Sequence, residues 1–470
     1  MRFRQQILRG MDELLLQMPV YKRRLLLLSL SLSNIADAVE VTSIGFLLSS
    51  LSHNKNNNTP DNTISSSSSG IFYASQGEKE LLGSSVIVGL LIGGVALGAL
   101  ADKMGRKPSL ELALCITLMA NLLASISPNI SFLIAMRLLG GLGVGGVLPI
   151  VYTFGAELVA SSERDAMMAS ITSFWVVGSL FSAILAYLIF TQTSFNWRVY
   201  QALCSLPSLL AFLSTHLLVE SPLYYIQIHQ YEKAKASLTY LSPHAEIPSQ
   251  TLLELDSSPI NSSSSSRSPS SPSTLTTIRS FISSSYSLPL CILSCIWFTQ
   301  HFSTFGMATW ISSLYFDLGI ANPYFASILF AVAVIPGNLF SIFFMHSLGR
   351  RNLLFWGMIL SAASLLGFAF STSSQILVII SSLLYNLFLI TGWNGLCCLS
   401  TDGYFETSVK SSAMGFMSAA GRVGGILAQV INCIVLTCTA YLKSSPDSSH
   451  SSCTDTWRLM SRFSLELLAC

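Results

Sequence analysis

Two carboxylic acids, Asp37 and Glu40, stand three residues apart in an apolar stretch at about residues 25–51. In a helix this spacing places both side chains on one face. A carboxylate inside a membrane is costly unless it is paired or hydrated, so such acids mark the paths of ions and solutes. We expect both to bind a proton, another cation or a cationic solute. The alternative is a structural ion pair, for instance with Arg422.

Later apolar stretches hold further candidates for solute binding. Arg422, within the run Gly421-Arg-Val-Gly424, can bind an anionic solute or hold an acid, and the sequence favours neither. Aromatic walls with few polar groups suit an organic solute and can hold cations over ring faces, although aromatic residues in membrane helices also serve packing. The residues that could form such a wall are Trp175, Trp297, Gln300, His301, Phe305, Trp310, Trp393 and Asn394. His301 either titrates near neutral pH or is a hydrogen-bonded spectator.

The sequence lacks the patterns of the common catalytic and metal sites. No cysteine pair combines C-x-x-C spacing with companion histidines, as zinc would require, and the ten cysteines read as small buried apolar residues. No nucleotide-binding G-x-x-x-x-G-K-[ST] motif and no nucleophile elbow is present. We therefore predict no enzyme, no cofactor and no metal site.

The composition places the chain in a membrane. Only 10% of its residues are charged and 51% are hydrophobic, whereas a soluble domain carries about 25% charged residues. Apolar runs of roughly 20 residues, the length that spans a bilayer, recur between short polar joints. The formal net charge of +2 gives no reason to expect nucleic acid as a partner. We predict an all-α transmembrane protein surrounded by lipid and monomeric.

We expect eleven membrane spans, at about residues 25–51, 82–101, 109–127, 131–154, 169–190, 200–219, 288–316, 323–346, 352–371, 375–400 and 412–442. The chain then divides into an N-terminal segment 1–24, a first bundle 25–219, a linker 220–287, a second bundle 288–442 and a tail 443–470. The linker is rich in Ser and Pro from residue 243 on, which predicts disorder, after a short surface helix at Tyr231–Leu241.

Two six-helix bundles would need a twelfth span, but the tail 443–470 contains no apolar run of that length. Either the protein has eleven spans, or the sequence is cut short or differently spliced within the twelfth. We favour the second interpretation.

Basic residues flank alternate loops, which indicates that these loops face the cytoplasm. They are Lys22, Arg23, Arg24, Lys103, Arg106, Lys107, Arg164, Lys233, Lys235, Arg350, Arg351 and Lys410. The N-terminus and the linker are then cytoplasmic, and the first span replaces a removable signal peptide. On the other side, Asn57 lies in a sequon, which is either a glycosylation site or a chance match in a low-complexity loop. The membrane is either the plasma membrane or that of a vesicle or organelle.

A string of glycines and charges, Gly98-Ala-Leu-Ala-Asp102-Lys-Met-Gly105-Arg106-Lys107, follows the second span. Gly98 would let two helices approach closely, and Gly105 permits a tight turn. The basic residues can pair with acids on a neighbouring helix. Ion pairs that break and re-form in this way can latch a gate with two states.

This string resembles the signature loop of the major facilitator superfamily, G-x-L-a-D-r-x-G-R-k, and a weaker copy, Gly349-Arg350-Arg351, follows the eighth span. Such a repeat is typical of two parallel halves. Three further features resemble the family: Arg137 opening a glycine-rich run, Glu157 seven residues before Arg164, and Glu220-Ser-Pro in place of the E-S-P-R block of sugar porters. Leu223 replaces the arginine of that block, which puts one ion pair in doubt.

Within the superfamily the sequence is similar to the synaptic vesicle glycoproteins and their relatives, including niacin and organic-ion transporters. The matching segments are Ala36–Val41, Phe174-Trp175, Trp197–Val199 and Trp393-Asn394. The resemblance implies a major facilitator fold of two pseudo-symmetric six-helix bundles. It also places Trp175, Phe305 and Trp393 on the solute-binding wall.

The second half departs from the family pattern. The family has a Glu followed seven residues later by an Arg at the end of span ten, where this sequence has Asp402 and Lys410 with Gly403 inserted. Cys397 replaces an acid of the vesicle glycoproteins, and their long insert between spans seven and eight is missing. The charge relay of the second half is therefore less secure than that of the first.

Taken together, these features predict a secondary transporter working by alternating access on a small organic solute, such as an organic ion, a carboxylate or a sugar-like molecule. Coupling to a proton or another ion in symport is one option and facilitated transport the other. The alternative function is a transporter-like scaffold or receptor that moves no solute, or an inactive truncated paralogue.

Overall fold

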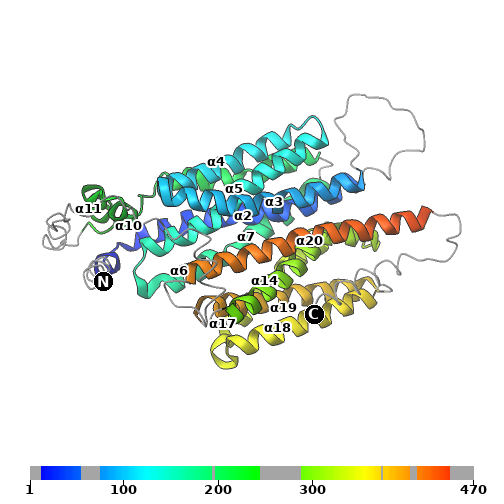
Figure 1. Cartoon of the computed structure of the whole chain (residues 1–470). Helices are drawn as coiled ribbons and strands as arrows, with labels where there is room; N and C mark the ends of the chain where they lie inside the picture. Colours follow the sequence, from blue (N-terminus) through cyan, green and yellow to red (C-terminus); the bar gives the residue numbers. More distant parts are fainter. Residues whose placement is uncertain are drawn as a thin grey trace.

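The computed structural model describes residues 12–53, 75–192, 196–243, 287–371, 374–402 and 410–444. The regular structure in these ranges is helical, and the helices form two bundles that lie side by side (Figure 1). The first bundle contains α2 (Val20–His53), α3 (Gln76–Met104), α4 (Arg106–Ser125), α5 (Ile130–Leu158), η1 (Ser161–Glu163), α6 (Arg164–Ser173), α7 (Trp175–Tyr187), η2 (Leu188–Gln192), α8 (Trp197–Cys204) and α9 (Leu206–Thr215).

Two short helices, α10 (Pro222–Gln227) and α11 (Tyr231–Leu241), follow the first bundle, and α11 coincides with the predicted surface helix. The second bundle contains α14 (Ser287–Ala308), α15 (Ile311–Asp317), α16 (Pro323–Val332), α17 (Val334–Leu348), α18 (Arg350–Phe370), α19 (Gln375–Asp402) and α20 (Lys410–Ser444).

Ten helical stretches of the described residues are long and apolar enough to cross a membrane. They correspond to ten of the eleven predicted spans. The remaining span, 200–219, is divided at Ser205 into α8 and α9, each shorter than a bilayer crossing. Pro207 accounts for the division, because proline has no N–H to donate and its ring displaces the carbonyl of the preceding turn.

Glycines allow α3 and α5 of the first bundle to pack with their backbones in contact. A Cβ atom at Gly89 or Gly93 of α3, or at Gly141 or Gly145 of α5, would overlap the backbone of the other helix. The glycine-rich run after Arg137 is therefore a packing surface as well as a sequence signature, as is usual where membrane helices approach closely.

The two bundles meet along α3 and α20, along α2 and α15, and along α7 and α16. Where α7 and η2 meet α16, aromatic rings close the interface. Phe190 stacks on Tyr324 with ring centroids 5.3 Å apart, and the ring centroids of Tyr187 and Phe325 are 6.3 Å apart. We call this end of the molecule, at which α2 ends and α3 begins, the aromatic end.

The other end, which we call the basic end, carries the junctions α3–α4 and α17–α18 together with α10 and α11 (Figure 1). The segment before α2 is fastened here. The Asp12 carboxylate accepts hydrogen bonds from the backbone N–H and hydroxyl of Ser161 at 3.2 and 2.6 Å, and Ser242 Oγ donates to the Leu14 carbonyl at 2.6 Å. The N-terminal segment and α11 are thus attached to the first bundle.

The structure corrects the expectation that Gly98 lets two helices approach closely. A Cβ atom at Gly98 would meet no described atom within 4 Å, and the same holds for Gly415 on α20. The close approaches of α3 occur instead at Gly89, Gly93 and Gly94. Three predictions concern residues outside the described ranges: glycosylation of Asn57, disorder of the linker after residue 243, and the missing twelfth span.

Candidate functional site

Glu40 and Arg137 form an ion pair in the interior of the first bundle. Arg137 Nη1 donates to Glu40 Oε1 at 2.9 Å, and both side chains are 1% exposed. Asn121 Nδ2 donates to Glu40 Oε2 at 2.6 Å, and Gln201 accepts from Arg137 Nη2 while donating to Asn121. Four helices, α2, α4, α5 and α8, each supply one of these side chains. Both Glu40 oxygens and both terminal nitrogens of Arg137 are therefore engaged, as a buried ion pair requires, and only Arg137 Nε of this pair has no partner among the described residues.

The alternative interpretation of the two acids, a structural ion pair, holds for Glu40, with Arg137 as its partner in place of Arg422. Arg137 therefore lies in the interior of the first bundle and not among the charged residues of the signature loop. Gly140 makes room for the pair, since a Cβ atom there would lie 2.5 Å from Glu40 Oε1. The carboxylate of Glu40 is held by its neighbours and is not open toward the second bundle.

Asp37 lies one helical turn before Glu40 in very different surroundings. It is 1% exposed, and neither carboxylate oxygen has a hydrogen-bond partner among the described residues. Its charge attracts that of Arg422, on the other bundle. The two acids predicted to act together are therefore not equivalent, and Asp37 is the one with free acceptor capacity.

Arg422 of α20 reaches across the interface to α3. Its Nη1 donates to the backbone carbonyl of Leu90 at 2.5 Å. Gly94 leaves the space for the guanidinium, because a Cβ atom at Gly94 would overlap Nη1. The arginine thus bonds the second bundle to the first while facing an acid of the first.

An aromatic cluster lies beside Arg422 in the second bundle. The Trp297 ring is 5.4 Å from that of His301 and 4.8 Å from that of Trp393, and His301 is 5.7 Å from Phe305. His301 Nδ1 lies 3.0 Å from the Trp297 carbonyl, and Trp297 Nε1 donates to Ser400 at 2.9 Å. These four aromatic side chains were predicted as parts of one wall, and the structure places them in contact.

Gly421 and Gly425 of α20 face this cluster. A Cβ atom at Gly421 would lie 2.6 Å from His301 Nδ1, and one at Gly425 would lie 2.9 Å from Phe305 Cδ2. The glycines on either side of Arg422 therefore fit α20 against the rings of α14, and this packing directs the arginine toward α3.

The other predicted wall residues use their polar groups on neighbouring helices. Gln300 donates to the Leu389 carbonyl at 2.9 Å, Trp310 Nε1 donates to Gln429 Oε1 at 2.8 Å, and Asn394 donates to Asn338 at 2.8 Å. Trp175 is half-buried at the start of α7, in the first bundle. The structure thus brings four of the predicted wall residues into ring contact, and it engages Gln300, Trp310 and Asn394 in hydrogen bonds to other helices.

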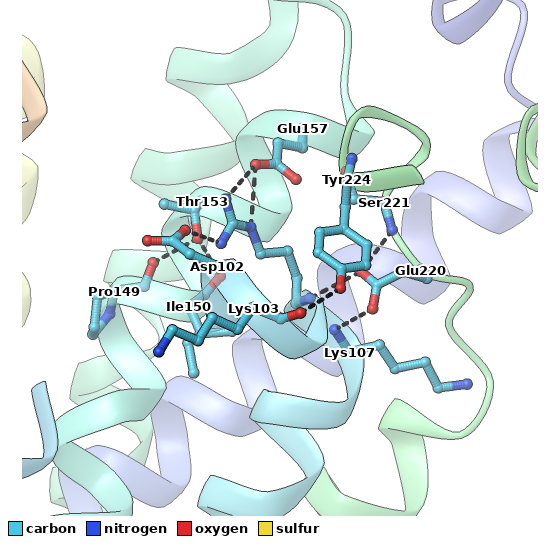
Figure 2. Close-up of polar contacts among 11 residues, drawn as sticks. Asp102, Lys103, Lys107, Pro149, Ile150, Thr153, Glu157, Glu220, Ser221 and Tyr224 are labelled. Atoms are coloured by element: carbon cyan, nitrogen blue, oxygen red, sulfur yellow. Dashed lines mark hydrogen bonds and ion pairs between the residues drawn. The ribbon is translucent and has the colours of Figure 1, made fainter. Parts of the chain in front are cut away.

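At the basic end, Figure 2 shows Asp102 and Lys107 of the signature loop in one group of polar contacts with Glu157 and Glu220. Arg106 Nη1 lies 2.5 Å from Asp102 Oδ1, and its Nη2 lies 3.2 Å from Glu157 Oε1. The Glu220 carboxylate accepts the backbone N–H groups of Arg106, Lys107 and Ser221 at 3.0, 3.1 and 2.8 Å. It therefore caps the N-terminus of α4, where an acid is favourable.

Burial raises the pKa of Glu220 above its ordinary value, although these three N–H groups oppose the shift. Gly105 lies beside this carboxylate with φ of 105°, where a Cβ atom would overlap Glu220. Lys107 Nζ donates to the Leu218 carbonyl at 2.7 Å. The predicted set Asp102, Gly105, Arg106, Lys107, Glu157 and Glu220 is therefore one cluster.

The remaining predicted gate residues lie outside this cluster. Arg164 Nη2 lies 3.9 Å from Asp12 Oδ1. Gly349 joins α17 to α18 with φ of 79°, and Arg350 and Arg351 are exposed at the start of α18. Asp402 ends α19 and Lys410 begins α20; their side chains lie outside the described part of the chain.

The chain is similar to known membrane transporters. The profile of the family described as "Sugar (and other) transporter" matches residues 41–444. The chain belongs to this transporter family. The niacin transporter NiaP of Acinetobacter baylyi is 25% identical to it over 347 residues, which are 73% of this chain and 75% of that protein. Synaptic vesicle glycoprotein 2C of Mus musculus is 29% identical over 216 residues, 44% of this chain and 27% of that protein.

Among solved structures, the xylose transporter XylE from E. coli in a partially occluded inward-open conformation superposes with a TM-score of 0.70 at 16% identity. The match covers 95% of this chain and 96% of that one, and shows the fold. Another XylE structure is titled as one of the major facilitator superfamily. The predicted superfamily and fold are confirmed, and this member of the sugar (and other) transporter family is an integral, multi-pass membrane protein.

The sequence analysis did not identify several polar residues that complete the site in this chain. Asn121 and Gln201 complete the Glu40–Arg137 network, and Gln429 accepts from Trp310. Each is a polar residue with apolar neighbours on both sides in the sequence, which is the available signal, since such residues seek partners on other helices. Leu90 and Gly94 could not be predicted from residue type. Leu90 contributes its backbone carbonyl, and Gly94 contributes the space left by its missing side chain.

Proposed function

We propose that the chain moves a small organic solute across its membrane by alternating access of the two bundles. Asp37 carries this proposal, because its buried carboxylate has no hydrogen-bond partner and faces Arg422 of the other bundle. An unpaired acid inside a membrane protein is unfavourable. Its retention is understandable if a proton, a cation or a solute group occupies it during a transport cycle.

The contacts between the bundles support the same interpretation. The bundles touch through rings at the aromatic end, whereas Gly98 and Gly415 toward the basic end have open space around them. Ring contacts between the bundles at the aromatic end are compatible with one state of an alternating-access cycle. The loops at the basic end would face the cytoplasm by the rule of positive charge.

The solute class is inferred from the aromatic cluster and from the relatives. Rings of Trp297, His301, Phe305 and Trp393 beside one arginine and one acid suit a small organic solute that carries a polar or charged group. The named relatives include niacin transporters and a proton:xylose symporter. An organic carboxylate, another organic ion or a sugar-like molecule fits these surroundings, and Asp37 would carry the coupling proton or ion.

Uptake into proteoliposomes tests this function. Purified protein would be given radiolabelled nicotinate or D-xylose as probes, with a proton gradient and without one. We expect accumulation of at least one probe by the unmodified chain, and loss of gradient-driven accumulation in Asp37→Asn. Glu232→Gln, at an exposed position of α11, is the matched control and should behave like the unmodified chain.

Absence of flux for these probes and for a wider panel of sugars and organic acids, from protein shown to be folded, would contradict the proposal. It would favour the alternative of a receptor or scaffold that moves no solute.

A further inference from the structure

One hydrogen bond joins a charged side chain of the second bundle to the backbone of the first. Arg422 Nη1 donates to the Leu90 carbonyl, near the middle of α3. A carbonyl at this place in a helix also accepts the N–H four residues later, here that of Gly94. The contact therefore satisfies the guanidinium without being needed by α3.

The same arginine faces a stronger acceptor that is unused. Both oxygens of Asp37 are buried without a partner among the described residues, and the charges of Asp37 and Arg422 attract each other. A hydrogen bond between two ionised groups is stronger than one to a neutral carbonyl. An ionised and empty Asp37 would therefore draw Arg422 away from Leu90, whereas a protonated or occupied Asp37 would not.

The other titratable groups around Asp37 and Arg422 already have hydrogen-bond partners. Glu40 on α2 is engaged by Arg137, Tyr152 on α5 is hydrogen-bonded to Thr172, and His301 on α14 contacts the Trp297 carbonyl. Asp37, by contrast, has no competing hydrogen-bond donor among the residues that the structure describes.

We propose that Arg422 is a positioning residue that couples the occupancy of Asp37 to the contact between the bundles. When Asp37 is neutral or occupied, Arg422 binds the Leu90 carbonyl and holds α20 against α3. When Asp37 is ionised and empty, Arg422 binds its carboxylate and releases α3. This inference rests on the proposed role of Asp37 as the coupling acid, and it assigns to Gly94 the role of keeping the Leu90 carbonyl accessible.

Hydrogen–deuterium exchange of the full chain in lipid nanodiscs tests the coupling without any solute. Exchange would be followed in peptides from residues 84–100 of α3 and 415–430 of α20, between about pH 5 and about pH 8, after correction for intrinsic rates. In the unmodified chain we expect faster corrected exchange at the higher pH. Asp37→Asn should keep the slow state at both pH values, because its amide cannot ionise.

Further variants change Arg422 itself or its contact with α3. Gly94→Ala should give fast exchange at both pH values, because the added methyl group overlaps Arg422 Nη1. Gly77→Ala makes the same change on the same helix where a Cβ atom meets nothing within 4 Å, and should match the unmodified chain. Arg422→Gln removes the cation without adding volume and should abolish the pH dependence, whereas Arg422→Lys should restore part of it.

Unchanged pH dependence in Asp37→Asn or in Arg422→Gln would overturn the proposal, even if Gly94→Ala fails to fold. Because exchange needs no solute, its outcome is separate from that of the uptake assay. A chain with the expected exchange but no flux would retain the switch and lose only the transport function.

Discussion

At the scale of single residues, Glu40 and Arg137 have the largest consequence for stability. Removing one member of a buried ion pair leaves the other without compensation, at a cost of about 3–5 kcal/mol. We expect Glu40→Gln and Arg137→Gln each to lower the melting temperature of the detergent-solubilised protein strongly. The double variant should be less destabilised than the sum of the two, as a thermal double-mutant cycle would show. Additive effects would mean that the two side chains do not interact.

Glu220 gives a pH dependence at the basic end. Burial raises the pKa of this carboxyl from its ordinary value of 4.5, so the folded state binds its proton more tightly than the unfolded state does. The stabilising contribution of the protonated form is present below pH 4.5 and is lost as the pH rises through the higher folded pKa. We expect the melting temperature of the unmodified chain relative to Glu220→Gln to fall across this window. A constant difference between the two proteins would contradict this assignment.

At the scale of helices, the contact of α3 with α5 depends on glycine. In Gly141→Ala the new methyl group would overlap the backbone at Val86. Overpacking of this kind costs about 1–3 kcal/mol, so we expect a clear loss of thermal stability. Gly77→Ala, at an open position of α3, should leave the melting temperature unchanged. Equal melting temperatures of the two variants would show that α3 and α5 tolerate a wider separation.

The sequence predicted helices and local clusters better than it predicted partners between helices. Asp102, Gly105, Arg106 and Lys107 are neighbours in the chain and need only one turn to meet, whereas Glu157 and Glu220, which complete the cluster, lie 51 and 114 positions from Arg106. Family motifs, and not local spacing, brought these two acids into the prediction. Glu40 was different. Two arginines, Arg137 and Arg422, were available to it, and the choice depends on how α2 is rotated against α5 and α20, which spacing within one helix does not determine.

The division of the sixth span shows a second limit. Pro207 is visible in the sequence, yet a proline in a membrane helix can either bend the helix or end it. The packing of Ser205 and its neighbours decides between these outcomes, and here α8 ends at Cys204. The contact between Gly94 and Arg422 could not be predicted for a related reason, because the two residues lie 328 positions apart in the chain.

At the scale of the whole molecule, stacked rings join the two bundles at the aromatic end. Phe190 stacks on Tyr324 across the interface and also lies 5.2 Å from Tyr200. An aromatic pair contributes about 0.5–1.5 kcal/mol beyond its buried area. We expect Phe190→Ala to shift the population toward a conformation that is open at the aromatic end. Faster hydrogen exchange in α7 and α16 would report the shift. Phe343→Ala, at a position 72% exposed, is the control; equal exchange in both variants would contradict the prediction.

The space that Gly94 leaves for Arg422 has a consequence for how the two bundles evolve. Gly94 lies in the first bundle and Arg422 in the second, so neither residue can change alone without disturbing the other. A lineage that gained a side chain at position 94 would be expected to have lost the arginine at 422 as well. Selection would then act on the two positions jointly, and the halves, although built alike, would have diverged as one inherited unit.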